Sequence, residues 1–194
     1  MTPIFRPHKL TKAFYTRPRK IALGGMVVEK REEIVEESVI HVARLMALSA
    51  ITAPKARGVD NIVVGVLKDK ADIESLAEAM EKMAEQMGDF FKRDADNVRR
   101  STAIVLIGCK IKDIGLKSPP RYPYDLNFVL NMLNLGIAVG SAAKTASLHN
   151  VDNRVMFSAG FAAQTLKLID ADVVLAIPLS ATSKSIYFDR PTMK

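Results

Sequence analysis

Apolar residues recur at steps of three and four along two stretches of the chain. The first covers residues 29–50 behind an acidic opening turn, and the second covers residues 71–87 and stops at Gly88. This period gathers the apolar side chains on one face, which predicts two amphipathic helices, and a glycine just past the end is typical of a helix C-terminus. The methionine-rich stripe of the second stretch indicates core filling rather than a cofactor site.

Short apolar runs between these helices predict strands. The runs are NIVVGVL (61–67), TAIVLIG (102–108), ADVVLAIP (171–178) and a terminal SIYFDR (185–190). DFFKRD, at residues 89–94, is a further short-strand candidate, while residues 124–149 and 156–168 predict two more helices. The variety of connections between strands and helices predicts an α+β fold, with a mixed β-sheet of four to five strands flanked by helices.

The positive charge is concentrated in the N-terminal part of the chain. The net charge is +7, and residues 1–25 contain six cations and no acid, so the rest carries only +1. This distribution argues against a nucleic-acid-binding face on the folded body. The pattern predicts a basic extension over residues 1–28, bounded near Gly24-Gly25, and a single domain over residues 29–194. A transit peptide, an arm packed on a partner subunit and an extension upstream of a start at Met26 remain alternatives for the extension.

Cysteine and histidine usage limits the metal chemistry. Cys109 is the single cysteine, which excludes an intramolecular disulfide and a metal or cluster site built from several thiolates of one chain. The three histidines lack metal-ligand spacing, and His41 has the place of a structural helix residue. No apolar run approaches the ~18 residues that a membrane span needs. We therefore expect a cytoplasmic protein without a metal or a membrane partner.

The stretch Pro54-Lys55-Ala56-Arg57-Gly58 is the first candidate site. A loop between a helix and a strand can turn backbone N–H groups inward, and two cations beside such a concavity can bind a phosphate. The spacing of a P-loop is absent. Plain solvation of two loop charges is the alternative interpretation.

A stripe of small residues on the long C-terminal helix is the second candidate. Gly136, Gly140 and Lys144 follow one another at four-residue steps, so one helix face is nearly bare and then presents an ammonium. Two helical glycines cost about 1 kcal/mol each relative to alanine and need a compensating close approach. The approaching object is a neighbouring helix, a second subunit or a flat ligand.

The segment PLSATSKS, residues 178–185, is the third candidate because hydroxyls surround Lys184 after a strand. Such a set suits a phosphate or another small anion, although Ser/Thr-rich turns are also ordinary connectors. The sequence shows no nucleophile–base pair at an informative spacing. Cys109, at a strand end, has the place of a small buried hydrophobe.

Four blocks of the sequence resemble a known family in order. They are ARLMALSAITAPKARGVDNIVV, DADNVRRSTAIVLIG, LGIAVGSAAKTASLHNVDNRVMFSAG and DADVVLAIPLSATSKSIYFDR. Together they resemble the uncharacterised prokaryotic family named for a ferredoxin domain, over residues 33–190. Members of that family usually carry a cysteine-rich insert after a Gly-Leu like Gly115-Leu116, and here GLKSPPRYPYD has no cysteine. Because a thiolate-held cluster needs about four cysteines, we expect that this chain has lost the iron–sulfur cluster.

The layout is similar, more distantly, to the FMN-dependent nitroreductases. In those enzymes a first helix also ends in Ala-Pro, and cations near the start and the end of the chain hold the flavin phosphate across a homodimer interface. The resemblance implies that Lys55, Arg57 and Lys184 contact the phosphate, with Arg190 as a further candidate. It places Lys144 near the flavin ring, where a cation stabilises the charge of the reduced form.

Together these interpretations predict a flavin-binding, oxidoreductase-like homodimer with FMN as its redox group and neither a cluster nor a metal. The alternative is a non-enzymatic binding or structural scaffold that keeps an anion pocket or a partner surface. The flavin-binding prediction and the anion pocket of the alternative both require cations from separate segments to meet around one small anionic ligand.

Overall fold

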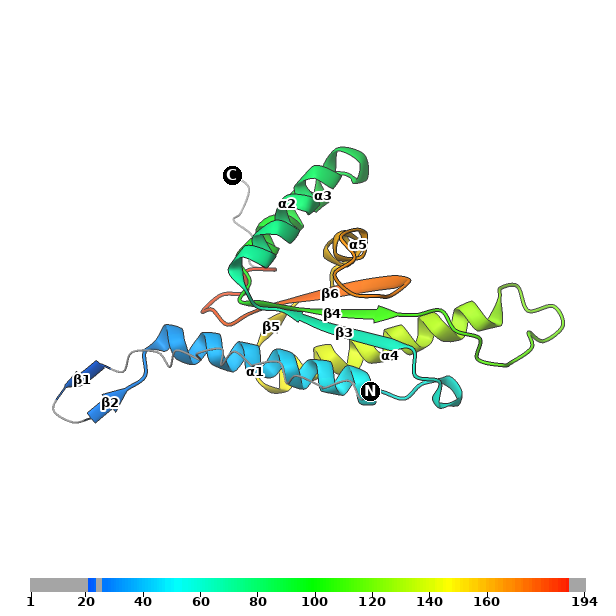
Figure 1. Ribbon diagram of the computed structural model, residues 1–194, viewed down its shortest axis with the longest axis horizontal. Coiled ribbons are helices and arrows are strands. Elements are labelled where there is room, and N and C mark those ends of the chain that lie inside the picture. The colour runs from blue at the N-terminus through cyan, green and yellow to red at the C-terminus, as the bar shows by residue number, and fades with distance from the viewer. Residues whose placement is uncertain (1–20, 24–25, 189–194) are drawn as a thin grey trace, which may run out of the picture.

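A computed structural model describes residues 21–23 and 26–188 of the chain (Figure 1). It begins with a short antiparallel hairpin of β1 (Ile21–Leu23) and β2 (Met26–Val28). The hairpin is a finding that the sequence pattern did not indicate, because the extension has no strand period. The boundary expected at Gly24-Gly25 and the residues before it lie outside the described part.

The rest of the described chain alternates helices with strands. The helices are α1 (Arg31–Thr52), α2 (Lys70–Met87), α3 (Phe90–Arg99), α4 (Leu126–Leu148) and α5 (Phe157–Thr165), with a 3-10 turn η1 (Ala56–Gly58). The strands are β3 (Ile62–Leu67), β4 (Ala103–Cys109), β5 (Asp152–Asn153) and β6 (Val173–Ser180). The α+β class and a sheet of four strands flanked by helices confirm the sequence-based prediction.

The four strands form one sheet in the order β3-β4-β6-β5. Every neighbouring pair in this sheet is antiparallel, so the parallel pairs of the expected mixed sheet are not found among the described strands. β4 is buried along its whole length, which agrees with its continuous apolar run and central position. Cys109 pairs with Ile62 of β3 on one side and with Val173 of β6 on the other. β3 and β6 therefore both begin at the end of the sheet where β4 finishes.

Helices cover both faces of the sheet (Figure 1). α1 and α4 lie side by side on one face, where the α1 stripe that the sequence predicted, from Val39 to Ala50, packs on alternate residues of β4 and β6. α2, α3 and α5 cover the other face with a second apolar cluster around Phe91 and Met80. Because successive side chains of a strand point to opposite faces of the sheet, the same strands contribute to two cores.

Two local predictions were wrong. Residues 90–99 form helix α3 rather than a short strand, and residues 185–188 form a turn rather than a terminal strand. In α3 the helical face includes the buried Asp94, whose carboxylate accepts a hydrogen bond from Ser158 Oγ at 2.6 Å and pairs with Arg93. A polar residue on the buried face hides the apolar period from the sequence.

Among the described residues, α4 is the one helix whose length and composition suit a membrane span. Its place in the fold accounts for its apolar character, because it packs on α1 and β4. It also carries the buried Asn131 and Asn134, whose amides bond to neighbouring segments. The absence of a membrane partner stays a prediction.

Candidate functional site

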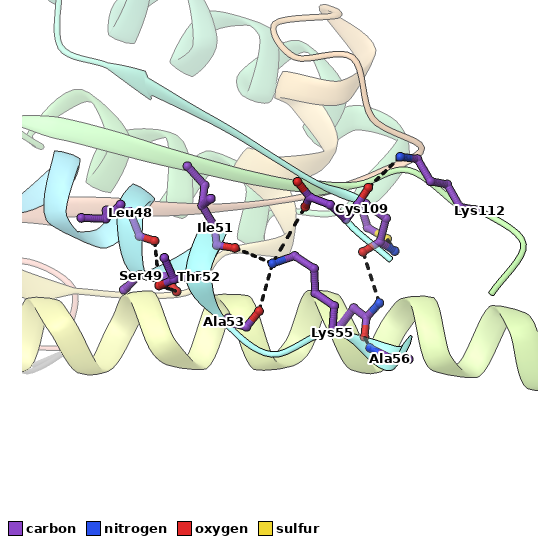
Figure 2. Close-up of polar contacts among 12 residues, drawn as sticks. Leu48, Ser49, Ile51, Thr52, Ala53, Lys55, Ala56, Cys109 and Lys112 are labelled. Atoms are coloured by element: carbon purple, nitrogen blue, oxygen red, sulfur yellow. Dashed lines mark hydrogen bonds and ion pairs between the residues drawn. The ribbon is translucent and has the colours of Figure 1, made fainter. Parts of the chain in front are cut away.

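The Lys55 ammonium group binds carbonyl oxygens at the C-terminal end of α1. Its Nζ donates to the carbonyl oxygens of Ile51 and Ala53, the latter at 2.9 Å, and lies 3.9 Å from the Asp60 carboxylate (Figure 2). The last carbonyls of a helix need donors from elsewhere, and Pro54 has no N–H to offer. The Lys55 side chain is only 8% exposed, so most of it is committed to the fold.

Arg57 reaches the loop that precedes α4. Its backbone is left-handed, with φ 52° and ψ 19°, inside the turn η1. The guanidinium Nη1 donates to the carbonyl oxygens of Ile114 at 3.1 Å and Gly115 at 2.9 Å. These bonds fasten η1 to the loop around Gly115 that precedes α4. A charge remains, because carbonyl oxygens solvate the guanidinium without neutralising it.

Three asparagines on one side of α4 hold these loops in place. Asn134 Oδ1 accepts a hydrogen bond from Ala56 N at 2.8 Å, and Asn127 Oδ1 accepts from Ile114 N at 2.7 Å. Between them, Asn131 Nδ2 donates to the carbonyl oxygen of Lys112 at 2.9 Å. The residues stand at steps of four and three on an otherwise apolar helix, and this spacing is the signal by which the sequence could have revealed them.

Cys109 lies beneath this group of asparagines as a buried thiol. Asn61 Nδ2 donates to Cys109 Sγ at 3.1 Å, and the side chain is fully buried. Burial, with a smaller contribution from Asp172, raises the pKa of the Cys109 thiol to about 11. Because thiolates are the nucleophiles and metal ligands, Cys109 is unsuited to redox or ligand chemistry in the folded chain.

We therefore expect Cys109 to resist thiol reagents in the native protein. Ellman's reagent should label it slowly near neutral pH and promptly after unfolding in urea. The folded chain holds the thiol proton more tightly than the unfolded chain, so stability should fall as the pH rises from about 9 towards 11. Fast labelling of the native protein would contradict the burial of this side chain.

Lys55 and Arg57 do not meet Lys184 within one protomer. Lys55 and Arg57 precede β3, at the end of the sheet where Ile62 pairs with Cys109. Lys184 is exposed and follows β6 at the opposite end of the sheet, where Leu179 pairs with Ala103. In β6 these two ends are marked by Val173 and Leu179, so they are about 20 Å apart at ~3.3 Å per residue.

Lys144 is exposed on α4, next to the contact in which Thr145 Oγ1 donates to Ser49 Oγ of α1 at 3.0 Å. Arg190 lies outside the described residues. The role of all five cations in ligand binding stays a prediction.

A hollow of about 610 Å³ lies over the outer side of α1. Its lining, among the residues that the structure describes, brings together side chains from α1, the end of β3 and the end of α4. These residues are Glu37, Ser38, Ile40, His41, Val42, Arg44, Lys68 and His149. The sequence does not reveal this set, because its members are spread over three elements and His41 has the place of a structural helix residue. His41 is exposed in the structure.

The outer face of α4, the helix that ends at this hollow, is apolar and open. Leu133 and Ile137 are 53% and 44% exposed, and Leu148 is 70% exposed. A methyl group added at Gly136 or Gly140 would have no other atom within 4 Å, so the small-residue stripe touches nothing in the described part of the protomer. An apolar helix face of this kind is typical of an interaction surface.

Solved structures with the same arrangement define the class of the fold. The chain aligns with the BluB-like flavoprotein from Clostridium difficile 630 over 85% of this chain and 88% of that one, with a TM-score of 0.53 and 16% identity. It aligns with a nitroreductase with bound FMN from Desulfitobacterium hafniense DCB-2 over 74% of this chain and 78% of that one, with a TM-score of 0.52 and 14% identity. The fold is nitroreductase-like.

A sequence relative identifies the family. An uncharacterized protein from Archaeoglobus fulgidus is 41% identical over 180 residues, which cover 84% of this chain and 97% of the relative. The family model described as "Uncharacterized protein containing a ferredoxin domain (DUF2148)" matches residues 126–190. The chain belongs to this family, which confirms the resemblance seen in its sequence. With Cys109 as its single cysteine, the loss of a cluster held by thiolates of one chain stays our prediction.

Proposed function

We propose that this protein is a cytoplasmic, FMN-binding, oxidoreductase-like protein that acts as a homodimer. One observation carries the proposal: a hollow lined by Arg44 and Lys68 lies at the C-terminal end of α4, the helix that carries an open apolar face with the bare Gly136 and Gly140. FMN combines a flat, largely apolar ring with a phosphate, and this surface offers a place of matching chemistry for each end. The volume of about 610 Å³ is within the usual range for cofactor sites.

Similarity to flavoproteins supports the same proposal. The structural neighbours include a BluB-like flavoprotein and a nitroreductase with bound FMN, and both share the fold at low sequence identity. When bound, FMN supplies hydride and single-electron chemistry. The contribution of the chain is then to hold the phosphate with cations, to cover the ring with apolar surface and to place an ammonium near it, for which Lys144 is the candidate.

An absorbance spectrum of the purified protein tests the proposal. We expect the visible flavin band in protein as isolated, or after incubation with FMN and removal of the excess, with FMN identified by mass spectrometry after denaturation. Thermal unfolding should shift upward with added FMN, because a ligand that binds only the folded state stabilises it. A colourless protein with no thermal shift would exclude flavin binding.

The second candidate function is a non-enzymatic scaffold with an anion pocket or a partner surface. One observation favours it: Lys55 and Arg57 bind backbone carbonyl oxygens, although both were expected to contact the flavin phosphate. A folded, colourless dimer that binds small anions but not FMN would support this candidate.

The homodimer has its own expected result. Changing Ile137 to Glu places a charge at the centre of the apolar face of α4, and two-fold symmetry would place two such charges opposite each other. We expect the dimer to dissociate at least about 30-fold more readily, because a central apolar contact is typical of an interface hot spot. Light scattering after size exclusion over a dilution series measures the change.

Leu168→Glu is the matched control for this variant. Leu168 is 40% exposed, close to the 44% of Ile137, but it follows α5 on the other side of the sheet. This substitution should leave the dimer intact. If Ile137→Glu and the parent protein have the same mass at all concentrations, α4 does not form the interface.

A further inference from the structure

Two of the cations that the sequence placed near candidate sites are already engaged. Lys55 caps α1, and Arg57 binds two carbonyl oxygens. Arg44 and Lys68 differ from these residues. Neither has a carboxylate of the described residues within ion-pair distance, and both line the hollow over α1.

The elements bring these two charges together from separate parts of the chain. Arg44 projects from the outer face of α1, opposite the buried Val42, Ala43 and Met46 stripe. Lys68 directly follows β3, where the strand leaves the sheet. An arginine and a lysine that share a hollow repel each other, so an anion between them lowers the electrostatic free energy.

The rest of the lining suits an oxyanion. His41 and His149 each carry a ring N–H that can donate to a phosphate oxygen, and Ser38 supplies a hydroxyl donor. Glu37 is the single carboxylate in the described lining. Two permanent cations with two imidazoles and one hydroxyl form a donor-rich set, and charge-assisted hydrogen bonds to phosphate are among the strongest that proteins make.

We propose that this hollow binds the phosphate group of a phosphate-bearing small molecule through Arg44 and Lys68, with His41 and His149 as further donors. The inference deepens the proposed function and, where the ligand is FMN, rests on it. His149 directly follows α4, so the hollow reaches the C-terminal end of the helix that carries the bare glycine stripe. From His149 to Gly140 the distance along the helix axis is about 13 Å at 1.5 Å per residue.

The test compares ligands with and without a phosphate. FMN, riboflavin and inorganic pyrophosphate are titrated by calorimetry at fixed low salt into the parent protein and the Arg44→Gln/Lys68→Gln double variant. We expect the affinities for FMN and pyrophosphate to fall on the order of 100-fold, about tenfold for each charge-assisted hydrogen bond lost. Riboflavin affinity should change less than about twofold, because riboflavin has no phosphate to lose those bonds.

A charge-matched control separates local contacts from net charge. Lys82→Gln/Lys117→Gln removes two exposed cations outside the hollow, from α2 and from the loop before α4. Its affinities for FMN and pyrophosphate should stay within about threefold of the parent, since distant exposed charges are screened. Circular dichroism checks that all variants fold, which we expect because the substituted side chains are exposed.

The outcomes distinguish this inference from the proposed function. If FMN binds and the Arg44→Gln/Lys68→Gln variant keeps its affinity, the hollow is not the phosphate site, while the proposed function stands. If FMN does not bind but pyrophosphate binds and the double variant loses it, the inference holds without the flavin. If neither ligand binds the parent protein, or if the control loses as much affinity as the double variant, the inference is overturned.

Discussion

Gly160→Ala should be one of the most destabilising single changes in the protein. Gly160 lies where α5 crosses β6, and a Cβ at this position would stand 2.3 Å from the carbonyl oxygen of Val174 and 2.6 Å from Cα of Leu175. Both atoms belong to the backbone of a strand in the middle of the sheet, so neither can turn away as a side chain would. We expect a loss of about 3 kcal/mol in the free energy of unfolding, at the upper end of the cost of overpacking.

Urea denaturation measures the loss, with Gly140→Ala as the matched control. At Gly140 the added methyl group meets no atom within 4 Å, so the higher helix propensity of alanine should stabilise the chain by up to about 1 kcal/mol. Both variants are built in the Ile137→Glu background, so that a partner subunit on α4 does not affect the comparison. Equal midpoints for Gly160→Ala and its parent would mean that α5 does not lie on β6 in this way.

The contrast between these two glycines explains how much of the fold the sequence could predict. The sequence singled out Gly140 because it repeats at helical spacing, and it gave no sign that Gly160 is the more constrained of the two. Regular periods predicted α1, α2, α4 and the strands β3, β4 and β6 because each buries a continuous apolar stripe or run. Close approach of backbones is a property of the assembled layers, so no local pattern encodes it.

The two mispredicted segments depend on partners far away in the chain. α3 buries Asp94 because Ser158, 64 residues later, donates to its carboxylate. Residues 186–188 form a turn, in which Tyr187 inserts into the core and its hydroxyl shares a hydrogen bond with Ser101 Oγ at 2.9 Å. This burial raises the pKa of Tyr187 to about 12. A polar side chain is stable in the core only when a hydrogen-bond partner is buried beside it. The sequence alone does not show such a distant partner.

The sequence predicts the type of residue expected at the candidate site, but not which cations line the hollow. Cations near an apolar, glycine-bearing helix are visible in the sequence, and Lys55 and Lys184 were reasonable choices on that ground. The structure commits Lys55 to the α1 carbonyls because Pro54 removes the usual backbone donor. It also places Arg44 and Lys68 on the lining of one hollow, which the sequence does not show because the packing of α1 on β3 is a tertiary contact.

Asn131→Leu should also cause a large loss of stability, because it removes the centre of a buried polar network. Asn131 is fully buried, and its Oδ1 accepts from Asn61 Nδ2 at 2.6 Å and from Lys112 N at 3.1 Å. Leucine fills a similar volume but leaves these two donors without that acceptor. Each buried unsatisfied group costs about 1–3 kcal/mol, so we expect about 3 kcal/mol in the free energy of unfolding.

Hydrogen exchange at the Lys112 amide separates loss of the network from a general effect on the helix. If Asn131 anchors the loop before α4, Asn131→Leu should release the Lys112 amide far more than the amides of β4, whose partners are backbone carbonyls of β3 and β6. Ser147→Ala is the control on the same helix, because that exposed hydroxyl bonds only to Ala143 O one turn before it. Its unfolding free energy should stay within about 0.5 kcal/mol of the parent. Equal protection of Lys112 in Asn131→Leu and the parent would show that the loop holds its position without this asparagine.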